Sequence, residues 1–150
     1  MKIIIQRVSD ASVKINNTIK GQIGQGFLIL LGISQTDSQN EIDWLVNKII
    51  NLRIFSDHLG KMNLSLKDIN GDILLISQFT LFASTKKGNR PSFLKSAKPE
   101  IAIPLYTQFI ETLSQKLNKQ IETGEFGADM QVSLTNDGPV TITIDTDDNY

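Results

Sequence analysis

The sequence predicts an α+β fold in which a mostly antiparallel, partly barrel-like sheet carries two main helices on one side. Strand patterns occur toward both ends of the chain, and a long apolar strand separates two segments with helical spacing. Two helices are too few to cover both faces of this sheet and also to close its edges. An uncovered face or edge favours association with a second copy, so a homodimer is expected.

The composition is that of one folded domain covering residues 1–150. Apolar residues make up 40% of the chain and charged residues 21%, which is typical of a soluble globular protein. The net charge of −1 gives no overall attraction to nucleic acid or to a membrane. The longest apolar run, FLILLGI, is too short to span a bilayer, and the opening MKIIIQRV lacks the apolar core of a signal peptide. A cytoplasmic protein with no membrane association is therefore expected.

The expected strands alternate with turns. Asn16 and Asn17 predict a turn, and the glycine-rich GQIGQG at 21–26 predicts a bend between strands, because a phosphate-binding loop needs a helix N-terminus behind it. The segment DILLISQFTLFA is apolar enough for a strand that is buried on both faces. The final residues TDDNY are expected to fray. The predicted strands are 2–8, 12–15, 26–33, 72–83, 128–135 and 140–145.

Two helices are predicted by the spacing of apolar residues. Ser38 and Glu41 form a capping-box pattern ahead of the first helix, at about 39–53. The second helix spans about 99–117, and Pro104 is tolerated because it lies near the start. The apolar faces comprise Ile42, Leu45, Val46, Ile49 and Ile50 in the first helix, and Ala102, Tyr106, Phe109, Leu113 and Leu117 in the second.

Several classes of catalytic site have little support in the residue types present. The chain has no cysteine, which excludes disulfides, thiolate nucleophiles and cysteine-based metal sites. His58 is the single histidine and lies in the polar segment SDHLGK, which predicts a surface turn and not the cleft that a serine hydrolase needs. No tight cluster of carboxylates is visible in the sequence, so we expect neither a metal nor another cofactor.

One segment of the chain is strongly basic. Residues 73–99 contain no Asp or Glu. A solvated loop at 84–92 and a contact with a phosphate backbone remain equally open from composition alone, and only the second predicts binding that weakens steeply with salt. The cations of this segment are Lys86, Lys87, Arg90, Lys95 and Lys98.

Two short motifs suggest a specific chemistry. SQFTL at 77–81 ends the most apolar strand, where polar side chains either find partners or face a cleft and where backbone N–H groups can stabilise an oxyanion. NDGPVT at 136–141 fits a hairpin whose return strand starts with proline. A cis bond between Gly138 and Pro139 is the alternative, and it would hold both carbonyl groups in one rigid direction.

Together these motifs resemble the paired signature S-Q-x-T-L and N-x-G-P-x-T of the D-aminoacyl-tRNA deacylases. The resemblance covers nearly the whole chain, through QRV and ASV, NLRIF, GKMNLSL, RPSF and ETGEFGADMQVSL in this order. It implies a homodimeric carboxylic ester hydrolase that cleaves D-aminoacyl-tRNA into free amino acid and tRNA and spares L-aminoacyl-tRNA, which is chiral proofreading in translation. It also implies cleavage of glycine mischarged on a tRNA such as tRNA-Ala.

The resemblance implies roles for individual residues. Ser77, Gln78 and Thr80 would be catalytic, and we favour positioning over nucleophilic attack for Thr80, since no activating base is evident. Phe79 would bind the aminoacyl end, and a cis Gly138-Pro139 pair would enter the partner's site as the chiral filter. The remaining implied residues are Phe126 and Met130 in the pocket for the 3′ terminal adenosine, Arg7 beside the Gly-Pro pair, and Lys86, Lys87 and Arg90 on the tRNA phosphates.

Two other functions remain open at this point. A non-enzymatic RNA-binding module would use the basic segment and a sheet surface, and it predicts salt-sensitive RNA binding without ester hydrolysis. A small-ligand-binding dimer without catalysis predicts no requirement for RNA. Incubation with charged tRNA and with the free aminoacyl ester separates all three.

Overall fold

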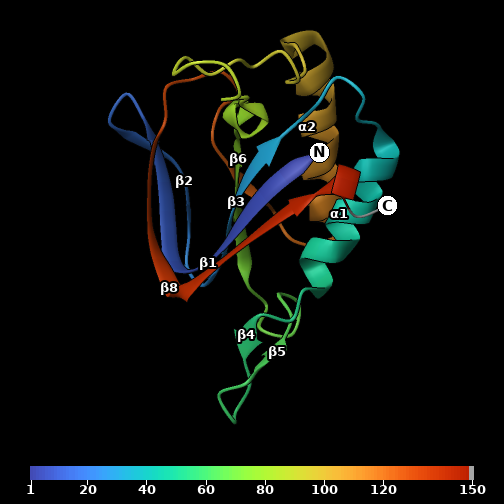
Figure 1. Cartoon of the computed structure of the whole chain (residues 1–150). Helices are drawn as coiled ribbons and strands as arrows, with labels where there is room; N and C mark the ends of the chain where they lie inside the picture. Colours follow the sequence, from blue (N-terminus) through green and yellow to red (C-terminus); the bar gives the residue numbers. More distant parts are fainter. Residues whose placement is uncertain (149–150) are drawn as a thin grey trace.

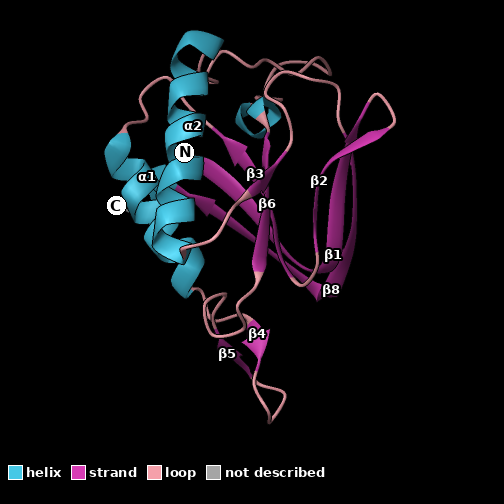
Figure 2. Cartoon of the chain, turned by 180° about the vertical axis from the view of Figure 1, so that it is seen from behind, coloured by secondary structure: helices cyan, strands magenta, loops and turns pink. Residues whose placement is uncertain are grey.

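A computed structural model describes residues 1–148 of the chain. Strands and helices form two layers, with both long helices on one side of the sheet (Figures 1 and 2). This arrangement confirms the predicted fold class. The elements in chain order are β1 (Lys2–Ile15), β2 (Thr18–Ile23), β3 (Gly26–Gly32), α1 (Gln39–Asn51), β4 (Phe55–Ser56), β5 (Met62–Leu64), β6 (Asp72–Ser77), the 3₁₀ helix η1 (Phe79–Phe82), α2 (Pro99–Leu117), β7 (Glu122–Thr123), β8 (Gln131–Asp145) and the 3₁₀ helix η2 (Thr146–Asp148).

The sheet is organised around β1, which pairs antiparallel with β2, β3 and β8. Beyond β3 the order continues through β6 and β7 in parallel pairings, so the sheet is mixed but mostly antiparallel. Gly21 in β2 lies so close to β7 that a Cβ there would meet the carbonyl oxygen of Thr123 at 2.9 Å. Since β2 and β7 are at opposite ends of the strand order, the sheet curls back on itself and is barrel-like.

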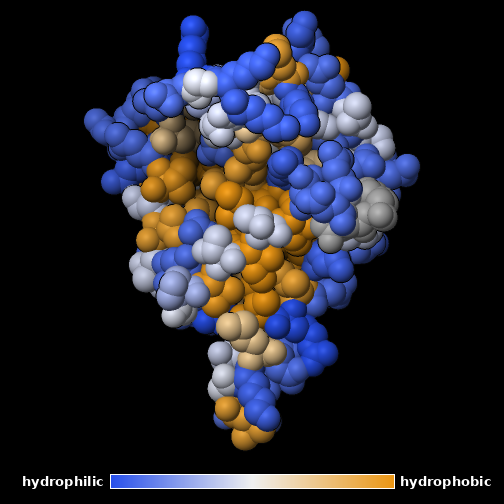
Figure 3. Space-filling model, viewed as in Figure 1, coloured by the Kyte–Doolittle hydropathy of each residue, from blue (hydrophilic) through white to orange (hydrophobic). Residues whose placement is uncertain are grey.

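The core has two parts because β3 and β6 are buried on both faces. Phe27, Ile29 and Leu31 of β3 face the helices, whereas Leu28 and Leu30 join a smaller apolar cluster inside the curl of the sheet. Such two-sided burial explains why these strands are nearly continuous apolar runs. Figure 3 shows an apolar area in the middle of the face on which these strands lie in Figure 1.

Both predicted helices are confirmed. Ser38 accepts a hydrogen bond from the Asn40 N–H and Glu41 accepts one from the Ser38 N–H, so the capping box is present. α2 has the predicted bounds, with Pro99 in its first turn and Pro104 still close to its N-terminal end. All the predicted apolar residues of α1 and all but Leu117 of α2 are buried, and Leu117 is partly buried against the same core. Within residues 1–148 no helix combines the length and the apolar character that a membrane crossing requires.

The predicted strand at 72–83 is too long. β6 ends at Ser77, and the chain then forms η1, in which the Leu81 N–H donates to the Gln78 carbonyl at 3.3 Å. Apolar composition continues through this point and hides the change, but the exposed Phe79 and Thr80 do not lie in the sheet.

The hairpin predicted at NDGPVT is also wrong. β8 is one strand, and both its halves pair with β1, through Gln6 with Thr141 and Val8 with Asn136 (Figure 1). Residues 137–140 therefore bulge out opposite the single residue Arg7. The predicted strands 2–8 and 12–15 are likewise one strand, β1, which is long enough to hold both halves of β8. β2 was missed, because Gly21 interrupts its pattern.

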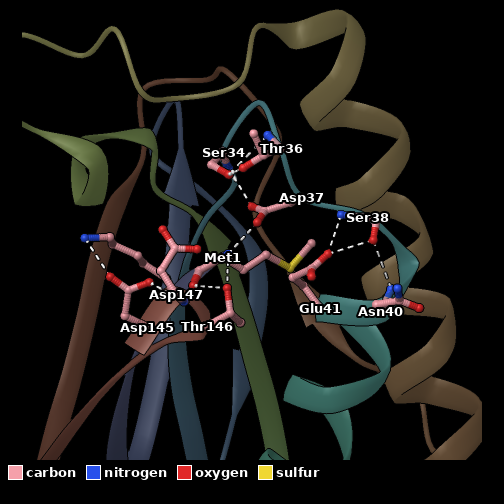
Figure 4. A network of polar contacts seen from close by, with 11 residues as sticks. Met1, Ser34, Thr36, Asp37, Ser38, Asn40, Glu41, Asp145, Thr146 and Asp147 are labelled. Carbon is pink, nitrogen blue, oxygen red and sulfur yellow. Dashed lines mark hydrogen bonds and ion pairs between the residues drawn. The ribbon is translucent and has the colours of Figure 1, made fainter. Parts of the chain in front are cut away.

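The prediction that the final TDDNY frays is wrong for residues 146–148, which form η2. Asn149 and Tyr150 lie outside the described residues. Thr146 is buried, and its hydroxyl oxygen lies 2.5 Å from the α-amino group of Met1. The same amino group donates to Asp37 Oδ1 at 2.6 Å (Figure 4). This buried network fastens η2 and the loop before α1 to the start of β1.

Candidate active site

A cavity of about 290 Å³ opens at the carboxyl ends of β3 and β6. Apolar side chains predominate in its wall, and the polar groups are concentrated where β6 ends, an arrangement typical of a small-molecule site. The lining residues are Leu31, Ile33, Ile76, Ser77, Gln78, Phe79, Ser96, Ala97, Ala102, Phe126, Gly127, Ala128, Met130 and Val132.

The polar wall is formed by the turn from β6 into η1. The Gln78 N–H donates to the Leu31 carbonyl at 2.8 Å, which fixes the turn to the end of β3. From there the Gln78 side-chain amide donates to the Thr80 hydroxyl, so these two motif residues lie together. The first backbone bond within η1 comes from the Leu81 N–H. The N–H groups of Phe79 and Thr80 precede it at the helix start, where N–H groups have no partner within the helix.

Another part of the cavity wall contains Phe126 and Met130. The Phe126 ring lies 5.9 Å from the ring of Tyr106, and the Tyr106 hydroxyl donates to the Leu75 carbonyl at 2.9 Å. Burial raises the pKa of Tyr106, so the hydroxyl remains protonated and keeps donating. Gly124 packs against Met130, so a Cβ at that position would push the Met130 side chain aside. Tyr106 thus connects β6 with the Phe126 side of the cavity.

The bulge that contains Gly138 and Pro139 is held from both sides. Arg7 is buried and donates from Nε to the Asp137 carbonyl at 3.0 Å and from Nη1 to the Ile54 carbonyl at 2.6 Å. Across the bulge, Asn136 Oδ1 accepts from the Val140 N–H at 3.0 Å. Gly138 and Pro139 lie between these contacts and are exposed. The peptide bond between them is cis.

A second pair of motif residues closes the bulge. Asn136 Nδ2 donates to the Thr141 hydroxyl at 3.0 Å, so the first and last residues of the motif N-x-G-P-x-T contact each other. The signal for this role was visible in the sequence as the spacing of the motif, but neither residue was among the predicted site residues.

The structure separates the bulge from the cavity within one chain. Arg7 pairs with Phe27, which pairs with Ile73 at the start of β6. Ser77, at the cavity, lies four residues further along β6, a distance of about 13 Å at ~3.3 Å per residue. One group of predicted site residues therefore surrounds the cavity, with Thr80 beside it: Ser77, Gln78, Phe79, Phe126 and Met130. The second group, Arg7, Gly138 and Pro139, lies elsewhere on the sheet.

Comparison with known proteins identifies the family. Residues 4–145 match the family model described as D-Tyr-tRNA(Tyr) deacylase. The chain belongs to this family. It is 62% identical over 146 residues to a D-aminoacyl-tRNA deacylase of Bacteroides fragilis, and likewise 62% identical over 146 residues to one of Flavobacterium psychrophilum, with 97% of each chain covered. A solved structure named c-Myc DNA Unwinding Element Binding Protein superposes with a TM-score of 0.92 at 44% identity, covering 97% of this chain and 98% of that one.

Membership of the deacylase family makes the chain a hydrolase, of the kind that cleaves the ester between an amino acid and tRNA. His58 is exposed in the turn between β4 and β5 and does not line the cavity. Among residues 1–148 no group of three or more histidines and carboxylates is arranged to hold a metal ion.

The predicted basic residues Lys86, Lys87 and Arg90 lie in a closed loop between η1 and α2. Ser84 and Ser92 pair as an isolated bridge, and Lys86, Lys87 and Arg90 are exposed between them. In Figure 1 the yellow segment that contains this loop crosses the end of the sheet on its way to α2. Sequence reasoning missed Phe93, whose ring meets Phe79 edge to face at 5.0 Å between centroids.

Proposed function

We propose that this protein hydrolyses the ester bond of D-aminoacyl-tRNA, releasing free amino acid and tRNA. The observation that carries this proposal is the cavity wall formed by Ser77, Gln78 and Phe79 with Thr80 beside it, in a chain of the deacylase family. The protein would act in the cytoplasm as a proofreading enzyme of translation.

The cavity suits the 3′ end of an aminoacyl-tRNA. Phe126 and Met130 supply an aromatic face and a polarisable sulfur, which suit the terminal adenosine. The aminoacyl group would then lie against Ser77 and Phe79, which line the same cavity. The exposed Lys86, Lys87 and Arg90 would contact the phosphates of the tRNA, so binding should weaken as salt rises.

Hydrolysis of the aminoacyl ester needs an oriented water molecule and groups that stabilise the oxyanion. The N–H groups of Phe79 and Thr80, at the start of η1, can donate to the ester oxygen as negative charge develops on it. An aminoacyl ester is already reactive and has a neighbouring ribose 2′-hydroxyl, which assists a bound water. The Gln78 amide donates to the Thr80 hydroxyl, and no histidine lines the cavity to activate that hydroxyl. Thr80 would therefore position the water or the substrate.

The chiral filter would come from a second copy of the chain. Gly138 and Pro139 are exposed, held rigidly through Arg7 and Asn136, and about 13 Å along the sheet from their own cavity, at ~3.3 Å per residue. In a homodimer each protomer would insert this pair into the site of its partner. Its carbonyl groups would clash with the Cβ of an L-residue, whereas a D-residue points its side chain away.

Acceptance of glycine as a substrate follows from the same geometry. Glycine has no Cβ, and a filter that works by a clash with Cβ cannot exclude it. The enzyme would therefore also release glycine that is mischarged on a tRNA such as tRNA-Ala. Side-chain type should matter little among D-amino acids, since backbone atoms discriminate.

The experiment that tests this function compares deacylation of D-Tyr-tRNA and L-Tyr-tRNA by one enzyme preparation. Rapid loss of the D-ester with the L-ester spared is the expected result. If the folded protein cleaves neither ester but binds tRNA in a salt-sensitive manner, it is an RNA-binding module. Equal cleavage of both esters would keep the hydrolase and remove the filter role of Gly138 and Pro139.

A further inference from the structure

The aromatic pair at the mouth of the cavity includes Phe93, a residue that has no role in the function proposed above. Phe93 lies outside the cavity lining, and its ring meets that of Phe79 at 5.0 Å with an angle of 72° between the ring planes. In an edge-to-face pair the edge of one ring covers only one face of the other, so the contact between the two rings does not use up their stacking faces. Phe79 itself is 56% exposed, although burial of an aromatic side chain is strongly favoured.

The surroundings of this pair are apolar and basic. Leu94 follows Phe93 and is 85% exposed, the largest exposure among the large apolar side chains of residues 1–148. Lys95 and Lys98 are exposed next to it. No acidic residue occurs between Ile73 and Pro99, so these cations have no carboxylate within their own segment. Exposed aromatic rings flanked by cations are the usual surface for single-stranded nucleic acid.

The segment is also fastened to the cavity wall. Ser34 and Ser96 pair as an isolated bridge, and the Ala97 N–H donates to the Ile33 carbonyl at 2.9 Å. Gln35 Nε2 donates to the Leu94 carbonyl at 3.2 Å. Since Ile33, Ser96 and Ala97 all line the cavity, the aromatic pair has a fixed position at its mouth.

We propose that Phe79 and Phe93 form a stacking subsite for the unpaired nucleotide that precedes the terminal adenosine of the substrate RNA. The proposal rests on the proposed function, because the terminal adenosine must occupy the cavity for its neighbour to reach the mouth. The base of that nucleotide stacks on the open aromatic face, and its phosphates lie toward Lys95 and Lys98. The subsite is tolerant of base identity, because every base has a π face. The chemical class of its ligand is single-stranded RNA.

The test compares two small substrates, the D-tyrosyl ester of adenosine and the D-tyrosyl ester of the trinucleotide CCA. For Phe93→Leu, the ratio of kcat/KM for the trinucleotide ester to that for the adenosine ester should fall about tenfold, which corresponds to ~1.4 kcal/mol, because the base loses its aromatic stacking partner. The fall should come from KM. Phe93→Tyr keeps an aromatic face and should restore the ratio.

Leu59→Ser is the matched control, because Leu59 is an exposed apolar residue on the β4–β5 turn, and it should keep the wild-type ratio. A wild-type ratio in Phe93→Leu, with both esters affected equally, would reduce Phe93 to a support for Phe79 and overturn the proposal. If the wild-type protein cleaves neither ester, the proposed function fails, and binding of uncharged CCA trinucleotide is measured instead. Equal CCA affinity of wild type and Phe93→Leu then overturns the subsite.

Discussion

Arg7 donates from Nε to the carbonyl oxygen of Asp137 at 3.0 Å, and its guanidinium also lies 3.3 Å from the Asp137 carboxylate. The residue comes from the central strand, and the carbonyl immediately precedes Gly138. A buried guanidinium is expensive unless its donors are satisfied, and here Ile54 accepts from Nη1. This pair therefore fixes the direction in which the bulge points away from the sheet.

Arg7→Met should both destabilise the protein and weaken discrimination between D- and L-esters. The substitution keeps a long side chain but leaves the buried Ile54 carbonyl without its donor, at a cost of roughly 1–3 kcal/mol in the free energy of unfolding. The bulge is then free to move, so the D-to-L ratio of deacylation rates should fall about tenfold, which corresponds to ~1.4 kcal/mol. Urea unfolding and paired deacylation assays measure the two effects.

Arg53→Met is the control for this substitution, because Arg53 is exposed and bonds to Asn63 on the β4–β5 hairpin. Arg53→Met should change neither the free energy of unfolding nor the D-to-L ratio of deacylation rates measurably. An Arg7→Met protein with wild-type selectivity would mean that the bulge does not need this anchor.

Gly138→Ala should impair activity more than stability alone explains. Gly138 has φ +127°, a conformation that L-residues rarely adopt, and an added Cβ would lie 2.9 Å from both Arg7 Nη2 and Val140 Cγ2. Backbone strain of this kind costs on the order of 1–3 kcal/mol, and relief of it would redirect the bulge. Gly24→Ala is the control, since within residues 1–148 no atom beyond its chain neighbours lies within 4 Å of the added Cβ. Full D-specific activity in Gly138→Ala would exclude the filter role.

The sequence predicted the components of the site better than their connections. The family resemblance assigns the motif SQFTL and the residues Phe126 and Met130 to the binding of one aminoacyl-tRNA end, and the structure places Phe126, Met130 and most of the motif around one cavity. The NDGPVT segment was predicted as a hairpin because local alternation cannot show which strand a segment pairs with. Its partner is β1, more than 120 residues away, and such pairing depends on the whole sheet.

Other errors also came from contacts distant in sequence. The C-terminal TDD looked like a fraying end, yet Thr146 is buried against the amino group of Met1. The contact between Phe79 and Phe93 spans a loop and has no periodic signal. By contrast, both helices were predicted closely, since capping and apolar spacing are local properties.

Thr80→Ala should retain measurable activity, reduced by about 10- to 100-fold, the range expected for a lost positioning contact. The hydroxyl interacts with the Gln78 amide, and the backbone N–H of residue 80 remains in place after the substitution. Single-turnover deacylation of D-Tyr-tRNA measures the rate, and Thr107→Ala on the exposed face of α2 is the control. Complete loss of activity with folding and tRNA binding intact would instead favour a nucleophilic threonine.

Acid should destabilise the fold through carboxylates that accept hydrogen bonds. The Ser65 N–H donates to Asp68 Oδ2 at 2.8 Å, and this bond lowers the pKa of Asp68 below its ordinary value of 3.8. A carboxylate with a lowered pKa in the folded state stabilises the fold above its unfolded pKa, and the contribution is lost as pH falls through the folded pKa. The free energy of unfolding should thus decrease below pH ~4. Asp68→Asn should make this decrease in the free energy of unfolding shallower, whereas the control Asp129→Asn should not. Urea unfolding of both variants across pH 2–6 measures the difference. Identical pH profiles for the two variants would exclude a contribution from Asp68.

Two variants that are each impaired should restore activity when they are combined in one dimer. Gln78→Ala damages the cavity, and Gly138→Ala damages the bulge. If each site takes its cavity from one protomer and its bulge from the other, a mixed dimer has one site with both defects and one site with none. Random pairing after co-expression makes half of the dimers mixed, so activity should return to about a quarter of the wild-type value. Deacylation of D-Tyr-tRNA by the co-purified variants measures this recovery. If the mixture is no more active than the mean of its two parents, each cavity uses the bulge of its own chain or none, and the shared site is excluded.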